Sequence, residues 1–187
     1  MRRIAEGVWQ VPGVAEPLSA DSLIIEGAAR YYVYDVGASD AAYDAIAALD
    51  KPVTVILSHF HRDHTANLSR LSPETVLVGA RTRRQLGTGT LVDAPLVIRD
   101  GVTIEVQPCV SPHAPGCLIA TVNGRLTFIG DLAYGHPDAG QGEARGMLRA
   151  LKGVRTQAFV VSHAQEEPVI SRDVFLAQTA EHFGVRP

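Results

Sequence analysis

Ser58-His59-Phe60-His61-Arg62-Asp63-His64 places three imidazoles and a carboxylate within six residues. The stretch follows an apolar run at 53–57, Val-Thr-Val-Ile-Leu, which predicts a buried parallel strand. Because side chains alternate along a strand, those of His59 and His61 are expected to point to one common place. Asp63 and His64 then turn toward a second place nearby. Neutral imidazole and ionised carboxylate are ligands of Zn²⁺ and related cations, so the stretch predicts a metal site.

The size and composition of the chain predict a single globular domain over residues 1–187. Its hydrophobic fraction of 46% is a globular value, and no apolar run has the roughly 20 residues of a membrane helix. No apolar segment of a secretory signal follows the basic pair near the start, so we expect a cytoplasmic protein. A net charge of −3 gives no general attraction for nucleic acid, which favours a small-molecule substrate.

Two cysteines, Cys109 and Cys117, are too few for a disulfide framework and lack the spacing of a cysteine-based zinc site. We expect both to be reduced thiols. Cys117 follows His113 closely, so the sequence leaves open whether it takes part in the metal site.

The segments before the motif predict half of a layered α/β fold. Apolar segments at 4–11, 22–26 and 31–36 predict an antiparallel meander, and Ser39 is a candidate cap for a helix over 39–49. The strand at 53–57 comes next, so the motif lies at the carboxyl end of a strand that follows a crossover helix. Open α/β sheets usually bind ligands at that position.

The segments after the motif predict a similar second half. Short helices are expected at 65–70 and 81–86 around a strand at 75–78, followed by a flexible loop at 87–90. Strands are expected at 96–98, 102–106, 118–122 and 126–129, and Asn123-Gly124 predicts a type I′ hairpin turn between the last two. The chain then predicts a helix at 143–151, a strand at 158–162 and a helix at 172–183. Strands followed by helices recur in each half, which favours a two-halved sandwich.

Three further candidate ligands stand at the ends of predicted strands. His113 lies in the loop Ser111-Pro112-His113-Ala114-Pro115-Gly116, where the prolines limit its movement. Asp131 follows Gly130, which permits a sharp turn, and His163 follows the strand at 158–162. Each has an ordinary structural explanation when taken alone, but together with the motif they favour a metal site.

With these residues in this order, the chain resembles the metallo-β-lactamase fold superfamily. The shared features are His-X-His-X-Asp-His, a histidine in a Pro-Gly loop, an aspartate after glycine and a final histidine. The strand ending in Asp35-Val36-Gly37 is similar as well. The resemblance spans nearly the whole chain and implies an αββα four-layer sandwich, with two mixed sheets inside and helices on the outer faces.

The resemblance also implies a ligand set for two metal ions. It assigns His59, His61 and His113 to the first ion and Asp63, His64 and His163 to the second, with Asp131 bridging them. Two Zn²⁺ ions are expected, and iron or manganese are the alternatives.

Two dications roughly 3.5–4 Å apart would lower the pKa of a shared water from about 16 toward about 7. We therefore expect a hydrolase whose metal-bound hydroxide attacks the carbonyl of an ester, thioester, lactone or lactam. Asp63 and Asp131 are the expected catalytic carboxylates. The loop at 132–138 is expected to border the site, with Tyr134 and His136 as candidate substrate contacts.

Two other interpretations remain open from the sequence. One is a mononuclear non-haem iron oxygenase resembling persulfide dioxygenases, which would use His59 or His113 together with Asp131. The other is a metal-binding module without catalytic activity. A chain this short has little to cover its own site, so a homo-oligomer in which a partner subunit supplies a wall is a further hypothesis.

Overall fold

The computed structural model describes residues 1–136, 140–164 and 167–185, whose strands form two sheets. The seven-stranded sheet contains, in spatial order, β1 (Arg2–Ala5), β2 (Val8–Val11), β3 (Ser22–Glu26), β4 (Tyr31–Tyr34), β5 (Val53–Ile56), β6 (Thr75–Val78) and β7 (Thr90–Leu91). The six-stranded sheet contains β13 (Val169–Ser171), β12 (Ala158–Val161), β11 (Leu126–Gly130), β10 (Cys117–Val122), β9 (Thr103–Cys109) and β8 (Leu96–Arg99).

Both sheets are mixed. Strands β1 to β4 pair antiparallel, and β4 to β7 pair parallel. In the second sheet only the β11–β12 pair is parallel. The helices are α1 (Asp40–Ala47), α2 (Arg62–Thr65), the 3₁₀ helix η1 (Ala66–Ser69), α3 (Ala80–Leu86), α4 (Gln141–Gly153) and α5 (Arg172–His182).

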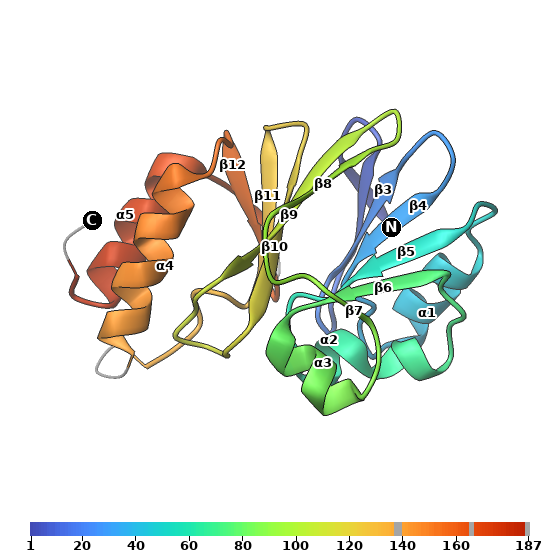
Figure 1. Ribbon diagram of the computed structural model, residues 1–187, viewed down its shortest axis with the longest axis horizontal. Helices are drawn as coiled ribbons and strands as arrows, with labels where there is room; N and C mark the ends of the chain where they lie inside the picture. The colour runs from blue at the N-terminus through green and yellow to red at the C-terminus, as the bar shows by residue number, and fades with distance from the viewer. Residues whose placement is uncertain (137–139, 165–166, 186–187) are drawn as a thin grey trace.

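The layers follow the order α, β, β, α, which confirms the predicted architecture. Figure 1 shows the two sheets facing each other, with α4 and α5 on the outer side of the six-stranded sheet and α1 on the outer side of the other. Three separate hydrophobic clusters fill the spaces between these layers, one between the sheets and one beneath the helices on each outer face. None of the helices in the described ranges has the length and apolar character needed to span a membrane.

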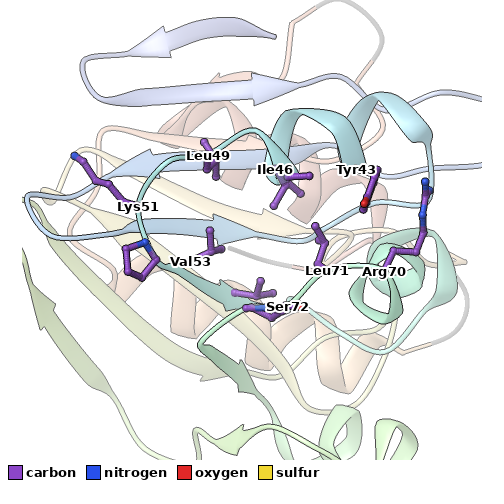
Figure 2. A pocket seen from close by; sticks show the side chains of 12 residues that line it. Tyr43, Ile46, Leu49, Lys51, Val53, Arg70, Leu71 and Ser72 are labelled. Carbon is purple, nitrogen blue, oxygen red and sulfur yellow. The ribbon is translucent and has the colours of Figure 1, made fainter.

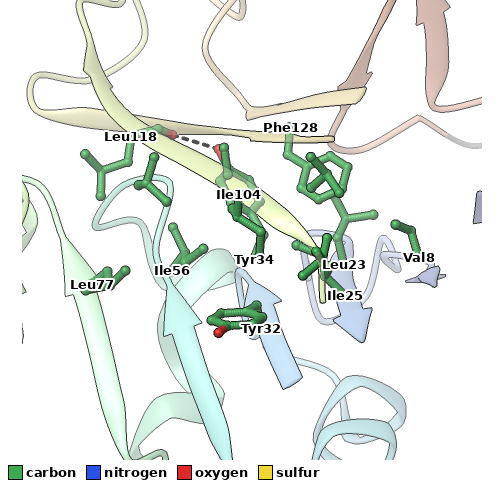
Figure 3. Close-up of a cluster of buried hydrophobic side chains, with 14 of the residues drawn as sticks. Val8, Leu23, Ile25, Tyr32, Tyr34, Ile56, Leu77, Ile104, Leu118 and Phe128 are labelled. Atoms are coloured by element: carbon green, nitrogen blue, oxygen red, sulfur yellow. Dashed lines mark hydrogen bonds between the residues drawn. The ribbon is translucent and has the colours of Figure 1, made fainter. Parts of the chain in front are cut away.

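The cluster between the sheets fixes how the sheets face each other. Ile56 and Phe128 come from opposite sheets and are fully buried there (Figure 3). The ring of Tyr34 lies 5.7 Å from that of Phe128, and its hydroxyl donates to the carbonyl of Leu118 at 2.8 Å. The ring of Tyr34 therefore packs in the apolar cluster while its hydroxyl makes a hydrogen bond, as buried tyrosines usually do. These contacts hold β4 and β5 of one sheet against β10 and β11 of the other.

Several predicted elements differ in detail. The segment at 4–11 forms two strands, because Gly7 adopts a φ of +66° and turns the chain between them. The helix expected at 65–70 begins earlier, at Arg62, and continues as η1. The segment at 87–90, predicted as a loop, leads into β7. Neither β7 nor β13 was predicted. Both strands are too short, with two and three residues, to show an alternating pattern. Asn123 and Gly124 have the positive φ angles of 52° and 62° expected for a type I′ turn, and the Arg125 N–H donates to the Val122 carbonyl at 2.9 Å. The strands pair Val122 with Leu126, so the connection contains three residues rather than two.

Cys109 and Cys117 face each other on β9 and β10 and are both buried free thiols. Burial raises the pKa of each thiol to about 12. Since the thiolate is the reactive form, we expect native protein at pH 8 to react with Ellman's reagent at least about 100-fold more slowly than unfolded protein. Absorbance at 412 nm checks this, and rapid release of two equivalents from native protein would contradict the burial described.

Candidate metal centre

The candidate ligands gather at the rim where the strands of both sheets end. His59 follows β5, Asp131 follows β11 and His163 lies two residues beyond β12, while His113 lies in the loop between β9 and β10. Gly130 turns the chain at the end of β11 with a φ of +52°. A Cβ at that glycine would lie 2.8 Å from the Ser58 side chain, so the close approach of β11 to the motif requires glycine.

The first group consists of His59, His61 and His113. Nε2 of His59 lies 2.9 Å from Nδ1 of His61 and 3.2 Å from Nε2 of His113. Nε2 of His113 lies 3.0 Å from Nδ1 of His61, which closes a triangle of nitrogens. Burial, with a smaller contribution from His64, lowers the pKa of His59 to about 2, and burial also lowers the pKa of His113. These two imidazoles are therefore neutral at pH 7 and offer lone pairs to a cation.

The second group consists of Asp63, His64, Asp131 and His163. Oδ2 of Asp63 lies 3.1 Å from Nε2 of His163 and 3.4 Å from Nε2 of His64. Burial alone would raise the pKa of Asp63, but the hydrogen bond with His163 and the charge of His64 lower it to about 2. Asp63 is therefore ionised at neutral pH.

Asp131 lies between the two groups. Its Oδ2 is 3.3 Å from Nε2 of His64, 3.5 Å from Nε2 of His163 and 3.6 Å from Nε2 of His113. One carboxylate oxygen thus approaches ligands of both groups. A residue so placed is suited to the bridging role that the resemblance implies for Asp131.

The spacing of these atoms matches what a tetrahedral metal site needs. Donors held at about 2.0–2.1 Å from Zn²⁺ in a tetrahedron lie about 3.3 Å apart. The contacts within the two groups measure 2.9 to 3.5 Å. Nε2 of His64 and Oδ1 of Asp131 are buried and make no hydrogen bond with any described residue. Buried polar atoms without a partner are rare, so these two atoms fit a role as ligands of bound cations.

Asp35 supports the histidines from beneath. Its carboxylate accepts hydrogen bonds from the Ser58 backbone N–H at 2.8 Å, the Ser58 hydroxyl at 2.7 Å and Nδ1 of His64 at 2.7 Å. The bond to Nδ1 leaves Nε2 of His64 facing Asp131, as a ligand to a metal would be held. Burial alone would lower the pKa of His64, but Asp35 and Asp131 raise it to about 10 in the metal-free chain. The sequence pointed to Asp35 only as part of a strand-end pattern, and Ser58 gave no sign of this role.

Of the two predicted substrate contacts, Tyr134 lies beside the centre and His136 is exposed. The ring of Tyr134 lies 6.4 Å from that of His163, and its hydroxyl donates to the carbonyl of Ser162 at 2.9 Å, so Tyr134 borders the centre. His136 is exposed, and the last two residues of the loop at 132–138 lie outside the described residues. Cys117 packs in the cluster beneath α4 and α5, with its Sγ 3.1 Å from the Ala114 carbonyl oxygen, and belongs to neither ligand group.

A pocket of about 190 Å³ opens beside the centre. His163 lines it together with Asp21 and the loop at 12–18, whose Val14 and Leu18 are 39% and 56% exposed. Exposed apolar side chains next to a few polar side chains are typical of small-molecule sites.

Another pocket, of about 300 Å³, lies beside α1 on the outer side of the seven-stranded sheet (Figure 2). Apolar side chains including Leu71 line it, and Lys51 and Arg70 lie toward its two ends. Both cations have carboxylate partners, Lys51 with Glu26 at 3.2 Å and Arg70 with Asp40 at 2.7 Å. None of the candidate metal ligands borders this pocket.

A scan of family models found no match, and a search of curated proteins found none either. Solved structures do match. The DIM-1 metallo-β-lactamase has a TM-score of 0.77 and 15% identity over 98% of this chain and 95% of its own. A metallo-β-lactamase from Pontibacter korlensis has a TM-score of 0.75 and 17% identity over 98% of both chains. A flavoprotein from Thermotoga maritima has a TM-score of 0.68 and 11% identity, and 60% of its length is covered. At such identities the likeness establishes the fold alone.

Proposed function

We propose that this chain, which has the metallo-β-lactamase fold, is a hydrolase that uses two divalent cations, most simply zinc, to attack a carbonyl group. The observation that carries the proposal is the convergence of seven donor side chains in two adjacent groups at tetrahedral spacing. His59, His61 and His113 would hold one ion, and Asp63, His64 and His163 the other. Asp131 would contact both.

Divalent cations in such a site supply Lewis acidity and make water a stronger acid, which is the chemistry that hydrolysis needs at neutral pH. The chain contributes the geometry. Asp35 fixes His64, and Ser58 lies 2.9 Å from Nδ1 of His59, so both rings have a fixed orientation. Asp63 is ionised and partly exposed, so it can orient a water molecule by accepting a hydrogen bond from it.

The surroundings of the centre favour a substrate with an apolar group beside its carbonyl. Val14 and Leu18 flank the pocket that His163 borders. An acyl chain or ring placed there would cover these side chains while its carbonyl faces the ligand groups. An ester, thioester, lactone or lactam would each fit this description.

Metal analysis combined with a hydrolysis panel tests the proposal. Protein purified without added metal is expected to contain about two zinc ions per chain and to hydrolyse at least one of a set of chromogenic esters, thioesters, lactones and lactams. Chelation should abolish the activity, and zinc should restore it. Hydrolysis that survives complete removal of metal would contradict the proposal.

An iron oxygenase is the competing function. A facial set of two histidines and one carboxylate is enough for such an enzyme, and Asp131 with His59 or His113 would supply it. The second group favours two ions instead, because a single-iron site has no use for Asp63, His64 and His163 converging 3.1 to 3.4 Å apart. About one iron per chain, with oxygen consumption on persulfides, would replace the proposal with this alternative.

A further inference from the structure

Asp21 is a buried carboxylate next to the centre, and it belongs to neither ligand group. It lies just before β3 and is 4% exposed. Its Oδ1 accepts hydrogen bonds from the Gln10 side-chain amide and from the Gly13 backbone N–H at 3.0 Å. Its Oδ2 accepts from the His163 backbone N–H at 2.7 Å and from the Ser162 hydroxyl at 3.4 Å. All four donors point at one side chain, so a carboxylate suits this position better than any neutral group.

The hydrogen bond from the His163 N–H to Asp21 is made by a residue with an unusual backbone conformation. His163 has a φ of +58°, in the left-handed region that residues other than glycine rarely adopt. This conformation turns the imidazole back toward the rim, where its Nε2 reaches Oδ2 of Asp63. The short bond from the His163 N–H to Asp21 offsets the cost of that conformation.

The residue before Asp21 holds the other side of the second group. The backbone N–H of Ala20 donates to the Asp63 carbonyl at 3.0 Å. The dipeptide at 20–21, just before β3 of the seven-stranded sheet, therefore fixes both Asp63 and His163, although His163 follows β12 of the other sheet. Oδ1 of Asp21 also holds the loop at 12–18 that lines the pocket.

We propose that Asp21 is a positioning residue for the second ion: it holds His163 in the left-handed conformation that directs its imidazole toward Asp63. The inference rests on the proposed function, because it assumes that His163 is a ligand. Residues that orient a metal ligand typically change metal affinity by about 10- to 100-fold when removed. The same loss is expected here for the second ion only.

The test is a competition titration of metal-free full-length protein with Zn²⁺ against a chromophoric chelator. We expect Asp21→Ala to weaken the second binding step by about 10- to 100-fold and to change the first step by less than about 3-fold. Asp21→Asn keeps an oxygen that can accept from the His163 N–H but sets an NH₂ group toward Gly13. Its affinity is expected to lie between those of Asp21→Ala and the wild type, which also covers the case that Asp21→Ala does not fold.

Asp100→Ala is the matched control. Asp100 also accepts two backbone N–H groups, those of Ala29 at 2.9 Å and Arg30 at 3.2 Å, but it does so beyond the other end of β3. Its loss is expected to lower thermal stability without changing either binding step. A crystal structure of Asp21→Ala or Asp21→Asn supplies a readout that is independent of metal, and the φ angle of His163 is expected to leave the left-handed region in the alanine variant.

Two results would overturn the proposal. One is a second binding step in Asp21→Ala equal to that of the wild type, and the other is an equal loss in Asp100→Ala. Both are distinct from failure of the proposed function, in which the wild-type protein itself would bind fewer than two ions.

Discussion

Replacing Asp131 with alanine is expected to lower kcat/KM for hydrolysis by at least about 100-fold, the scale for losing one main electrostatic contributor to a transition state. Oδ2 of Asp131 lies within 3.6 Å of ring nitrogens from His64, His113 and His163. Alanine removes the one carboxylate that approaches both groups. Initial rates on the best chromogenic substrate, with metal content measured on the same sample, check this.

Asp173→Ala is the control for this variant, because the Asp173 side chain is 91% exposed on α5 and pairs only with Arg172 among the described residues. It should keep wild-type activity and metal content. If Asp131→Ala retained more than about a tenth of the wild-type rate while folding normally, Asp131 would not be part of the reacting centre.

Replacing Asp35 with alanine is expected to destabilise the metal-free protein by about 3 kcal/mol or more, the usual cost of breaking a buried charged pair. Asp35 is 1% exposed and pairs with His64, whose side chain is fully buried. In the metal-free chain Asp35 helps to raise the pKa of His64 to about 10, so at pH 7 the variant would either bury an imidazolium without its main partner or lose that proton. Both Ser58 donors would lose their acceptor as well. The free energy of unfolding from guanidinium titration measures the effect.

Asp35→Asn separates the charge of Asp35 from its shape. Asparagine tolerates the φ of +57° found at this position, and its amide oxygen can still accept from the Ser58 N–H. The loss should therefore be smaller than for alanine. Equal losses in the two variants would mean that the charge of Asp35 accounts for the whole effect. An asparagine variant as stable as the wild type would mean that the ion pair with His64 contributes little to stability.

The fold was predictable because its strands carry clear signals. The run at 53–57 has no polar face, as expected for a strand covered on both sides, and Val55 and Ile56 are indeed fully buried. The pair Asn123-Gly124 predicted a type I′ turn, because both residues readily adopt the positive φ angles that this turn needs. By contrast, β7 and β13 have two and three residues, so they depend on pairing with β6 and β12 rather than on their own pattern.

The convergence of the candidate ligands was predictable in part, and for a different reason. Asp131 and His163 follow β11 and β12, which are neighbouring parallel strands, so their positions along the chain place them at one edge of a sheet. His59 follows β5 of the other sheet, and only the resemblance to a known fold placed it with them. The supporting residues lacked such a signal. Asp21 precedes a strand rather than following one, and its partner His163 lies 142 positions away in the sequence. Only the packing of the two sheets brings Asp21 to His163.

The most direct test is anomalous diffraction from crystals of the protein grown with zinc, with data collected on both sides of the zinc absorption edge. Two peaks are predicted at the shared rim of the sheets, one among His59, His61 and His113 and one among Asp63, His64 and His163, with Asp131 between them. A rim without an anomalous peak, or with one ion only, would contradict a two-metal centre.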